Sequence, residues 1–145
     1  MQLDDYLPYR LAVTSNRVSR MVARAYHARF GLTIWEWRVI AVLGEGRPRT
    51  AQALCDAAAM DKVQVSRAVK ALVERRLISR TRREADRRSA LLELTDDGRI
   101  VYEDVAQVAL SAEASLLEGM DAQEIERFLD VLGRLQRRAQ AMLDG

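Results

Sequence analysis

The chain has 145 residues, 49% hydrophobic and 30% charged, a balance that suits one compact domain with a buried core and excludes a disordered tail. Its one cysteine, Cys55, excludes an intramolecular disulfide, and together with the one histidine, His27, it provides too few ligands for a structural zinc site. No apolar run reaches the roughly 18 residues of a membrane span, and the N-terminal segment is acidic where a signal peptide is basic, so we expect a cytoplasmic protein with no membrane partner.

The net charge of +2 hides a strong asymmetry along the chain. Residues 61–90 contain ten Lys or Arg against four Asp or Glu, a net charge of +6, whereas residues 91–145 have a net charge of −7. A localised basic segment beside an acidic one is typical of a protein that binds a polyanion. The alternative is a solvated charged surface with no ligand.

The first predicted elements are two helices. Apolar residues recur at helical spacing from Pro8 to about Phe30, and Gly31 ends this helix. Thr33, with Glu36 three residues on, predicts a capping box for a second helix that runs to Gly44.

Two shorter helices follow the break at GEGRPR. Thr50 is a plausible N-cap for a helix to about Ala59, and Asp61, with Gln64 three residues on, caps another helix to about Arg76. These helices meet at a tight turn around Met60, which is the arrangement of a helix-turn-helix unit.

The pattern then changes from helical spacing to alternation. LISRTRR and SALLELT each alternate with period two, so we predict a two-stranded hairpin over residues 77–95 with a loose tip at EADR. A long helix follows over residues 95–118, and Asp121 begins a last helix with an apolar seam that needs a partner.

Helix, turn, helix and hairpin together predict a winged helix-turn-helix fold, mainly α with a small β wing. We interpret residues 1–145 as a single domain, in which 33–95 form the winged lobe with its wing at 77–95, 95–118 a connecting helix, and 1–30 and 119–145 dimerisation helices. The terminal helices have more apolar surface than a small lobe can cover, which favours a homodimer over an intramolecular bundle.

The second helix of such a unit inserts into the DNA major groove. A helical projection places Val65, Ala68, Val69, Leu72 and Arg76 on one side, and Val63, Arg67, Lys70 and Glu74 opposite. Arg67 suits guanine, Gln64 suits adenine, Val63 suits a thymine methyl group, and Lys62, Ser66 and Lys70 suit phosphates.

The segments LTIWEWRVIAVL, DKVQVSRAVKALVERRLISR and DRRSALLELTDDG resemble the MarR family of bacterial transcriptional regulators. The family pattern D-x-R, followed by L-T and Gly, falls on Asp86, Arg88, Leu94, Thr95 and Gly98. The resemblance implies a homodimer whose two winged units bind a pseudo-palindromic double-stranded operator. It also implies that Arg88 enters the minor groove, that Asp86 orients it, and that a cleft holds a small aromatic or anionic effector.

The remaining predicted site residues lie in the hairpin, where they could contact DNA, and near the junction of the first two helices, where they could bind an effector. A cation at a hairpin tip can enter a narrow groove, which supports Arg88, whereas Arg87 touches a phosphate or nothing, and Asp86 can equally be a turn residue. At least one of the hairpin arginines Arg80, Arg82 and Arg83 should meet phosphate. Candidates for the effector pocket are Trp35, His27, Tyr26, Tyr9 and Arg17.

The alternatives to an effector-released repressor are a redox-gated DNA binder, an effector-independent DNA binder and an enzyme. Cys55 could make the protein a redox-gated DNA binder, although a small buried apolar residue is the simpler interpretation, and Cys55→Ser would separate the two. An enzyme is not expected, because the chain has no Gly-rich phosphate loop, no metal-ligand cluster, no cofactor motif and no nucleophile beside a histidine.

Overall fold

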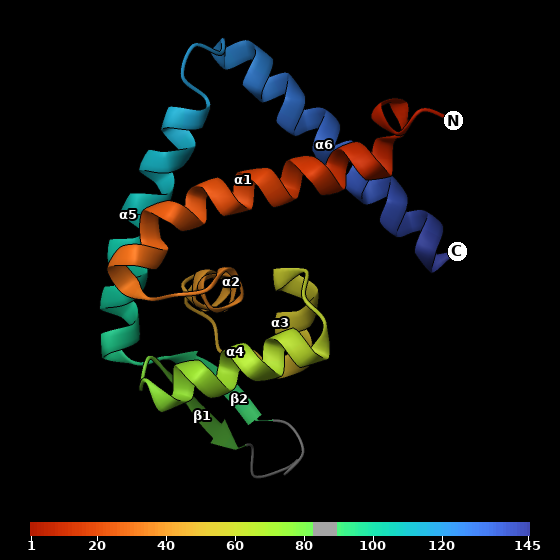
Figure 1. Cartoon of the computed structure of the whole chain (residues 1–145). Helices are drawn as coiled ribbons and strands as arrows, with labels where there is room; N and C mark the ends of the chain where they lie inside the picture. The colour runs from red at the N-terminus through yellow and green to blue at the C-terminus, as the bar shows by residue number, and fades with distance from the viewer. Residues whose placement is uncertain (83–89) are drawn as a thin grey trace. The chain divides into compact units, whose positions relative to one another are not determined.

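The computed structural model describes residues 1–82 and 90–145 (Figure 1). The elements are a short 3₁₀ helix η1 (Leu3–Asp5), α1 (Leu7–Phe30), α2 (Ile34–Leu43), α3 (Ala51–Ala58), α4 (Lys62–Glu74), β1 (Ile78–Arg82), β2 (Ala90–Leu94), α5 (Asp96–Leu116) and α6 (Ala122–Asp144). The predicted fold class, mainly α with a small β wing, is confirmed. The chain divides into two compact units, Met1–Glu113 and Ala114–Gly145.

Both predicted capping boxes are present and set where α2 and α4 begin. The Thr33 backbone N–H donates to Glu36 Oε1 (3.0 Å), and the Glu36 N–H donates back to Thr33 Oγ1 (3.1 Å). Asp61 and Gln64 exchange the equivalent bonds at 3.1 and 2.8 Å. Each box satisfies backbone donors that a helix N-terminus otherwise leaves without partners, so these starts are encoded locally.

The helix ends are less well predicted than the starts. Arg76, expected on the buried side of α4, lies beyond the end of the helix at Glu74 and is exposed, with a left-handed φ of 60°. The Leu77 N–H donates to Leu72 O (3.0 Å), which closes the helix end and turns Leu77 into the core. Ala59, with a φ of 54°, ends α3 in the same way. Neither left-handed residue is glycine, so neither turn has the residue type that usually marks a helix end of this kind.

The hairpin has the predicted antiparallel pairing, from Ile78 opposite Leu94 to Arg82 opposite Ala90. A further segment, which the sequence does not indicate, pairs with β2. Arg49 exchanges two backbone hydrogen bonds with Leu92, at 2.9 and 2.8 Å. The α2–α3 loop is therefore paired with β2, which ties the wing to the helix-turn-helix unit.

The core of the unit Met1–Glu113 lies between α2, α3, α4 and the hairpin, which are grouped together in Figure 1. An aromatic row extends it toward α1 and α5, with ring centroids 5.9 Å apart for Tyr26 and Trp37 and 6.2 Å apart for Trp37 and Tyr102. Trp37 is partly buried and packs against the core. The buried apolar residues include Leu32, Val39, Ile40, Leu43, Leu54, Val65, Val69, Leu72, Ile78, Leu92 and Val105.

The two ends of the chain contrast with this core. No residue of α6 is buried, and its exposed apolar side chains include Phe128 and Leu129, with 60% and 58% of their surface accessible. Leu3, Tyr6 and Leu7 are exposed at the other end. None of the helices in the described residues is long and apolar enough for a bilayer crossing.

Candidate nucleic-acid interface

The outward face of α4 is the centre of the candidate interface. Val65, Ala68, Val69 and Leu72 are buried, as the helical projection predicted. The exposed residues on this helix include Lys62, Val63, Ser66, Arg67, Lys70 and Glu74. Because four apolar side chains anchor one side, the orientation of the other side is set by packing rather than by the polar residues themselves.

The Gln64 side chain takes part in the capping box of α4, which affects the hydrogen bonds that it can offer to DNA. Its side-chain oxygen Oε1 accepts the Asp61 backbone N–H at 3.1 Å as part of the capping box, and the side chain is half-buried. A bidentate contact to adenine needs both the oxygen and the amide N–H₂ group. In this arrangement Gln64 has its N–H₂ donors available and its oxygen already engaged.

A cavity of about 580 Å³ lies beside α4 and brings several predicted DNA-binding residues together. Its walls come from α3, α4 and the hairpin, and they combine an apolar floor that includes Val69 and Leu92 with the cations Lys62, Arg80 and Arg82 and the hydroxyl of Ser66. Arg80 and Arg82 are exposed on β1. Residues separated by up to 20 positions in the sequence thus form one positively charged surface.

Cys55 also lines this cavity, and it is half-buried rather than buried. It packs against the core from α3, in keeping with a small apolar role. Within residues 1–82 and 90–145, no group of three His, Cys, Asp or Glu side chains could hold a metal ion.

Packing at the base of the hairpin accounts for the residue types at Thr95 and Gly98. Thr95 Oγ1 donates to Arg76 O at 2.7 Å and accepts the Gly98 N–H at 3.0 Å, so one hydroxyl joins the end of α4 to the start of α5. Gly98 is buried, and a Cβ at this position would overlap the Leu77 carbonyl. The L-T-x-x-G pattern is therefore a packing requirement of the hairpin base. The predicted tip residues Asp86, Arg87 and Arg88, with Arg83, lie outside the described residues.

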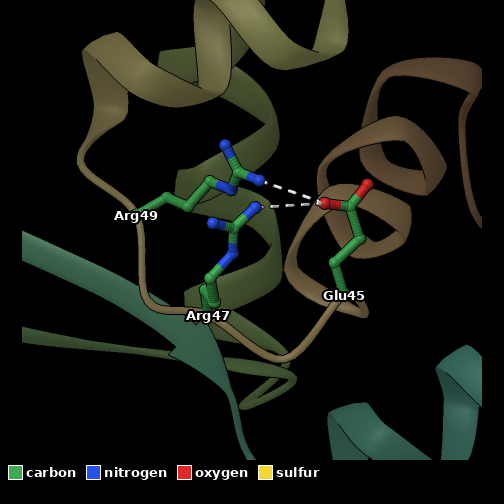
Figure 2. A network of polar contacts seen from close by, with 3 residues as sticks. All are labelled: Glu45, Arg47 and Arg49. Atoms are coloured by element: carbon green, nitrogen blue, oxygen red, sulfur yellow. Dashed lines mark hydrogen bonds and ion pairs between the residues drawn. The ribbon is translucent and has the colours of Figure 1, made fainter.

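A polar network holds the α2–α3 loop at the other side of the hairpin (Figure 2). The Arg49 guanidinium donates to Glu45 Oε2 at 3.1 Å, and Arg47 Nη2 lies 4.0 Å from the same oxygen. Arg47 is largely exposed, whereas Arg49 is mostly buried. The loop contains two arginines that were not among the predicted site residues, and both belong to the sequence GRPR directly before the Thr50 cap.

The five residues predicted for an effector pocket do not share either of two cavities in the winged lobe. Tyr26 is buried in the aromatic row, where desolvation raises the pKa of its hydroxyl and the nearby Arg38 cation partly opposes that rise. His27 Nδ1 lies 3.0 Å from Leu32 O and supports the α1–α2 turn. Tyr9 and Arg17 are exposed on α1.

Trp35 is the exception, because it lines a second cavity. This cavity has a volume of about 250 Å³ and lies between the first turn of α2 and α4. Its other walls are Thr33, Glu36, Val63, Gln64, Arg67 and Ala68. The structure therefore places Trp35 beside the outward face of α4.

Comparison with known proteins identifies the family. A family model described as MarR family matches residues 30–89, and no curated protein sequence matches the chain. The chain is 30% identical to a MarR family transcriptional regulator from Silicibacter pomeroyi DSS-3, with 94% of this chain and 98% of that chain covered and a TM-score of 0.77.

Other solved structures extend the similarity. A MarR/EmrR family transcriptional regulator from Acinetobacter sp. ADP1 is 28% identical, with coverages of 97% and 99% and a TM-score of 0.87. BpsR of Bordetella bronchiseptica, whose DNA binding is regulated by 6-hydroxynicotinic acid, is 22% identical, with coverages of 91% and 99% and a TM-score of 0.82. The chain belongs to the MarR family of transcriptional regulators.

Proposed function

We propose that this transcriptional regulator is a homodimeric repressor that binds a specific double-stranded operator and is released by a small effector. The observation that carries the proposal is the exposed polar and cationic face of α4, which continues into the cations of β1 around one cavity. Such a surface matches the two requirements of DNA recognition, which are a helix for the major groove and cations for the adjacent phosphates.

The side chains on α4 divide by chemistry. Arg67 points outward with five donors and suits a guanine edge, and the exposed Val63 suits a thymine methyl group. Lys62, Ser66 and Lys70 suit phosphate oxygens. Gln64 suits an adenine edge through its N–H₂ donors, while its oxygen already accepts one bond in the cap.

The hairpin completes the proposed interface. Arg80 and Arg82 are exposed on β1 beside the cavity and suit the backbone of the same duplex. We propose on the sequence pattern that Arg88 enters the neighbouring minor groove with Asp86 orienting it, and that Arg87 contacts phosphate.

The homodimer is supported by the apolar surface at the chain ends. A helix with exposed Phe128, Leu129 and Val131 and no buried residue is expected to bury that stripe against another surface. A second copy provides an identical stripe, and the resulting twofold symmetry would present two α4 helices to half-sites about 34 Å apart.

The effector is proposed to be a small aromatic acid. The support is the regulation of DNA binding in BpsR by 6-hydroxynicotinic acid, a ligand of that class, in a protein with the same fold. Release follows if the effector binds more tightly to a dimer whose two α4 helices no longer match the operator.

The decisive experiment isolates genomic fragments retained by the purified protein and measures binding to one of them by fluorescence anisotropy. We expect nanomolar binding at physiological salt, with an unrelated duplex bound at least about a thousandfold more weakly. Equal affinity for both duplexes would contradict sequence-specific binding. A panel of aromatic carboxylic acids is then added, and at least one is expected to dissociate the complex; release by none would contradict the effector class.

A further inference from the structure

The position of Trp35 points to a role different from an effector contact. Trp35 is 39% exposed, which is unusual for so large an apolar residue in a helix that contributes Val39, Ile40 and Leu43 to the core. The second tryptophan, Trp37, is held in the aromatic row. Core packing therefore accounts for Trp37 and leaves the exposed ring of Trp35 unexplained.

The surroundings of Trp35 are part of the candidate interface. Across the 250 Å³ cavity lie Val63, Gln64 and Arg67, all on the first two turns of α4. The cavity is smaller than the roughly 300–1,000 Å³ typical of sites for drug-sized ligands. Trp35 and Val63 thus form two neighbouring exposed apolar side chains with Arg67 beside them.

The charges around the ring favour an anionic partner. The Arg38 guanidinium carbon lies 5.3 Å from the centroid of the Trp35 ring, and Arg38 also donates to Ser19 Oγ on α1 at 3.4 Å. The carboxylate that lines the cavity, Glu36, is 7% exposed and accepts the Thr33 N–H in the capping box. The ionic groups next to the indole that are not buried are therefore cations, the half-buried Arg38 and the exposed Arg67.

Groove geometry identifies the partner. When a helix lies in the major groove, the segments beside its first turns meet the sugar and phosphate strand that forms the groove wall. A deoxyribose presents C–H groups that pack on an aromatic face, and the indole N–H can donate to a phosphate oxygen. An exposed tryptophan flanked by arginines matches both parts of that strand.

We propose that Trp35 contacts the DNA backbone, with its ring packed on a deoxyribose of the strand that borders the first turns of α4. This inference rests on the proposed DNA binding and adds to it a contact from α2. Because sugars carry no sequence information, the contact contributes similarly to specific and non-specific affinity, and it fixes how deeply α4 enters the groove.

The direct test uses the fact that the chain has only two tryptophans. In Trp37→Phe, the only fluorescent indole is Trp35; in Trp35→Phe, it is Trp37. We expect DNA to change the emission of Trp37→Phe and to reduce its quenching by acrylamide at least about twofold, with little change in Trp35→Phe. If Trp37→Phe fails to fold, the difference between wild type and Trp35→Phe measures the same quantity.

Binding measurements complete the test. Trp35→Ala should weaken binding to the selected genomic fragment and to an unrelated duplex by about tenfold each, because about 55 Å² of apolar contact is lost at about 25 cal/mol per Å². Trp35→Phe should retain most of the affinity. Thermal unfolding and dimer mass should match wild type, because the ring is outside the core.

The outcomes separate this inference from the function on which it rests. If the wild type binds no DNA, the proposed function and the Trp35 contact are both wrong. If the wild type binds and Trp35→Ala binds equally well, the backbone contact alone is overturned. If benzoate, as a probe aromatic acid, shields Trp35 from acrylamide and DNA does not, Trp35 belongs to an effector site and the inference is wrong.

Discussion

The winged lobe and the terminal helix α6 differ in whether their apolar residues are buried. In the lobe, α4 buries Val65, Val69 and Leu72 and exposes cations and hydroxyls. In α6, Phe128 and Leu129 remain exposed and no residue is buried. The lobe buries its apolar residues in a core and exposes a polar surface, whereas α6 exposes its apolar residues. A polyanion suits the first surface and a second protein chain suits the other.

The largest effect is expected from placing charge on the apolar stripe of α6. Phe128→Asp with Leu129→Asp should weaken dimerisation by about a thousandfold or more, because two large side chains lose their burial in each copy of a symmetric interface. Operator binding should fall with it. Sedimentation velocity measures the dimer, and anisotropy measures the DNA.

The matched control adds the same charge to the opposite face of α6. Gln123→Asp with Ala141→Asp should leave the dimer intact. Equal loss in both double variants would indicate an effect of net charge and contradict a specific apolar interface.

Two glycines offer the second test, with opposite expected signs. Gly98→Ala should destabilise the lobe by about 2–3 kcal/mol, because the added methyl group overlaps the Leu77 carbonyl. Gly133→Ala, within α6, meets only the flexible end of Arg137 at 3.3 Å and should stabilise the helix by about 0.5–1 kcal/mol. Thermal denaturation measures the stability of both variants. A change in the same direction for the two would contradict the difference between the tightly packed Gly98 and the open position of Gly133.

The third test separates the wing from the dimer. Arg88→Ala should weaken operator binding by about tenfold, through loss of its minor-groove contact, and should leave the dimer mass unchanged. Arg87→Ala is the neighbouring control and should have a smaller effect. Unchanged operator affinity in Arg88→Ala would eliminate the proposed role of the wing tip.

The smallest effect concerns a single phosphate contact. Lys70→Ala should weaken binding a few-fold on any duplex and lower the slope of log affinity against log salt by about one. Glu74, on the same face of α4, provides a control, since Glu74→Ala should not lower that slope. Loss on one sequence only would identify Lys70 as a base contact.

Much of the fold was predictable because its signals are local. Thr33, Asp61 and Asp121 cap helices where expected, and Gly31 ends α1 with a left-handed φ of 65°. Period-two alternation predicted β1 and β2. Each signal depends on residues within one or two turns, so the sequence alone contains it.

The features that the sequence did not predict have a common cause, which is contact between distant segments. The pairing of Arg49 with Leu92 joins residues 43 positions apart, and neither segment indicates the other. The neighbours of Trp35 were likewise not predictable from the sequence. Val63 and Arg67 come from a different helix, and only folding brings them next to Trp35.

The sequence by itself determined the helix starts, the hairpin, the buried side of α4 and the resemblance to a family, because these follow from spacing and capping along one segment. The tertiary structure decided which separate residues share a surface. It joined Lys62 and Ser66 to Arg80 around one cavity and placed Trp35 beside α4. The physical reason is that periodicity specifies which side of an element is buried, whereas side-chain packing between elements specifies what the exposed side lies next to.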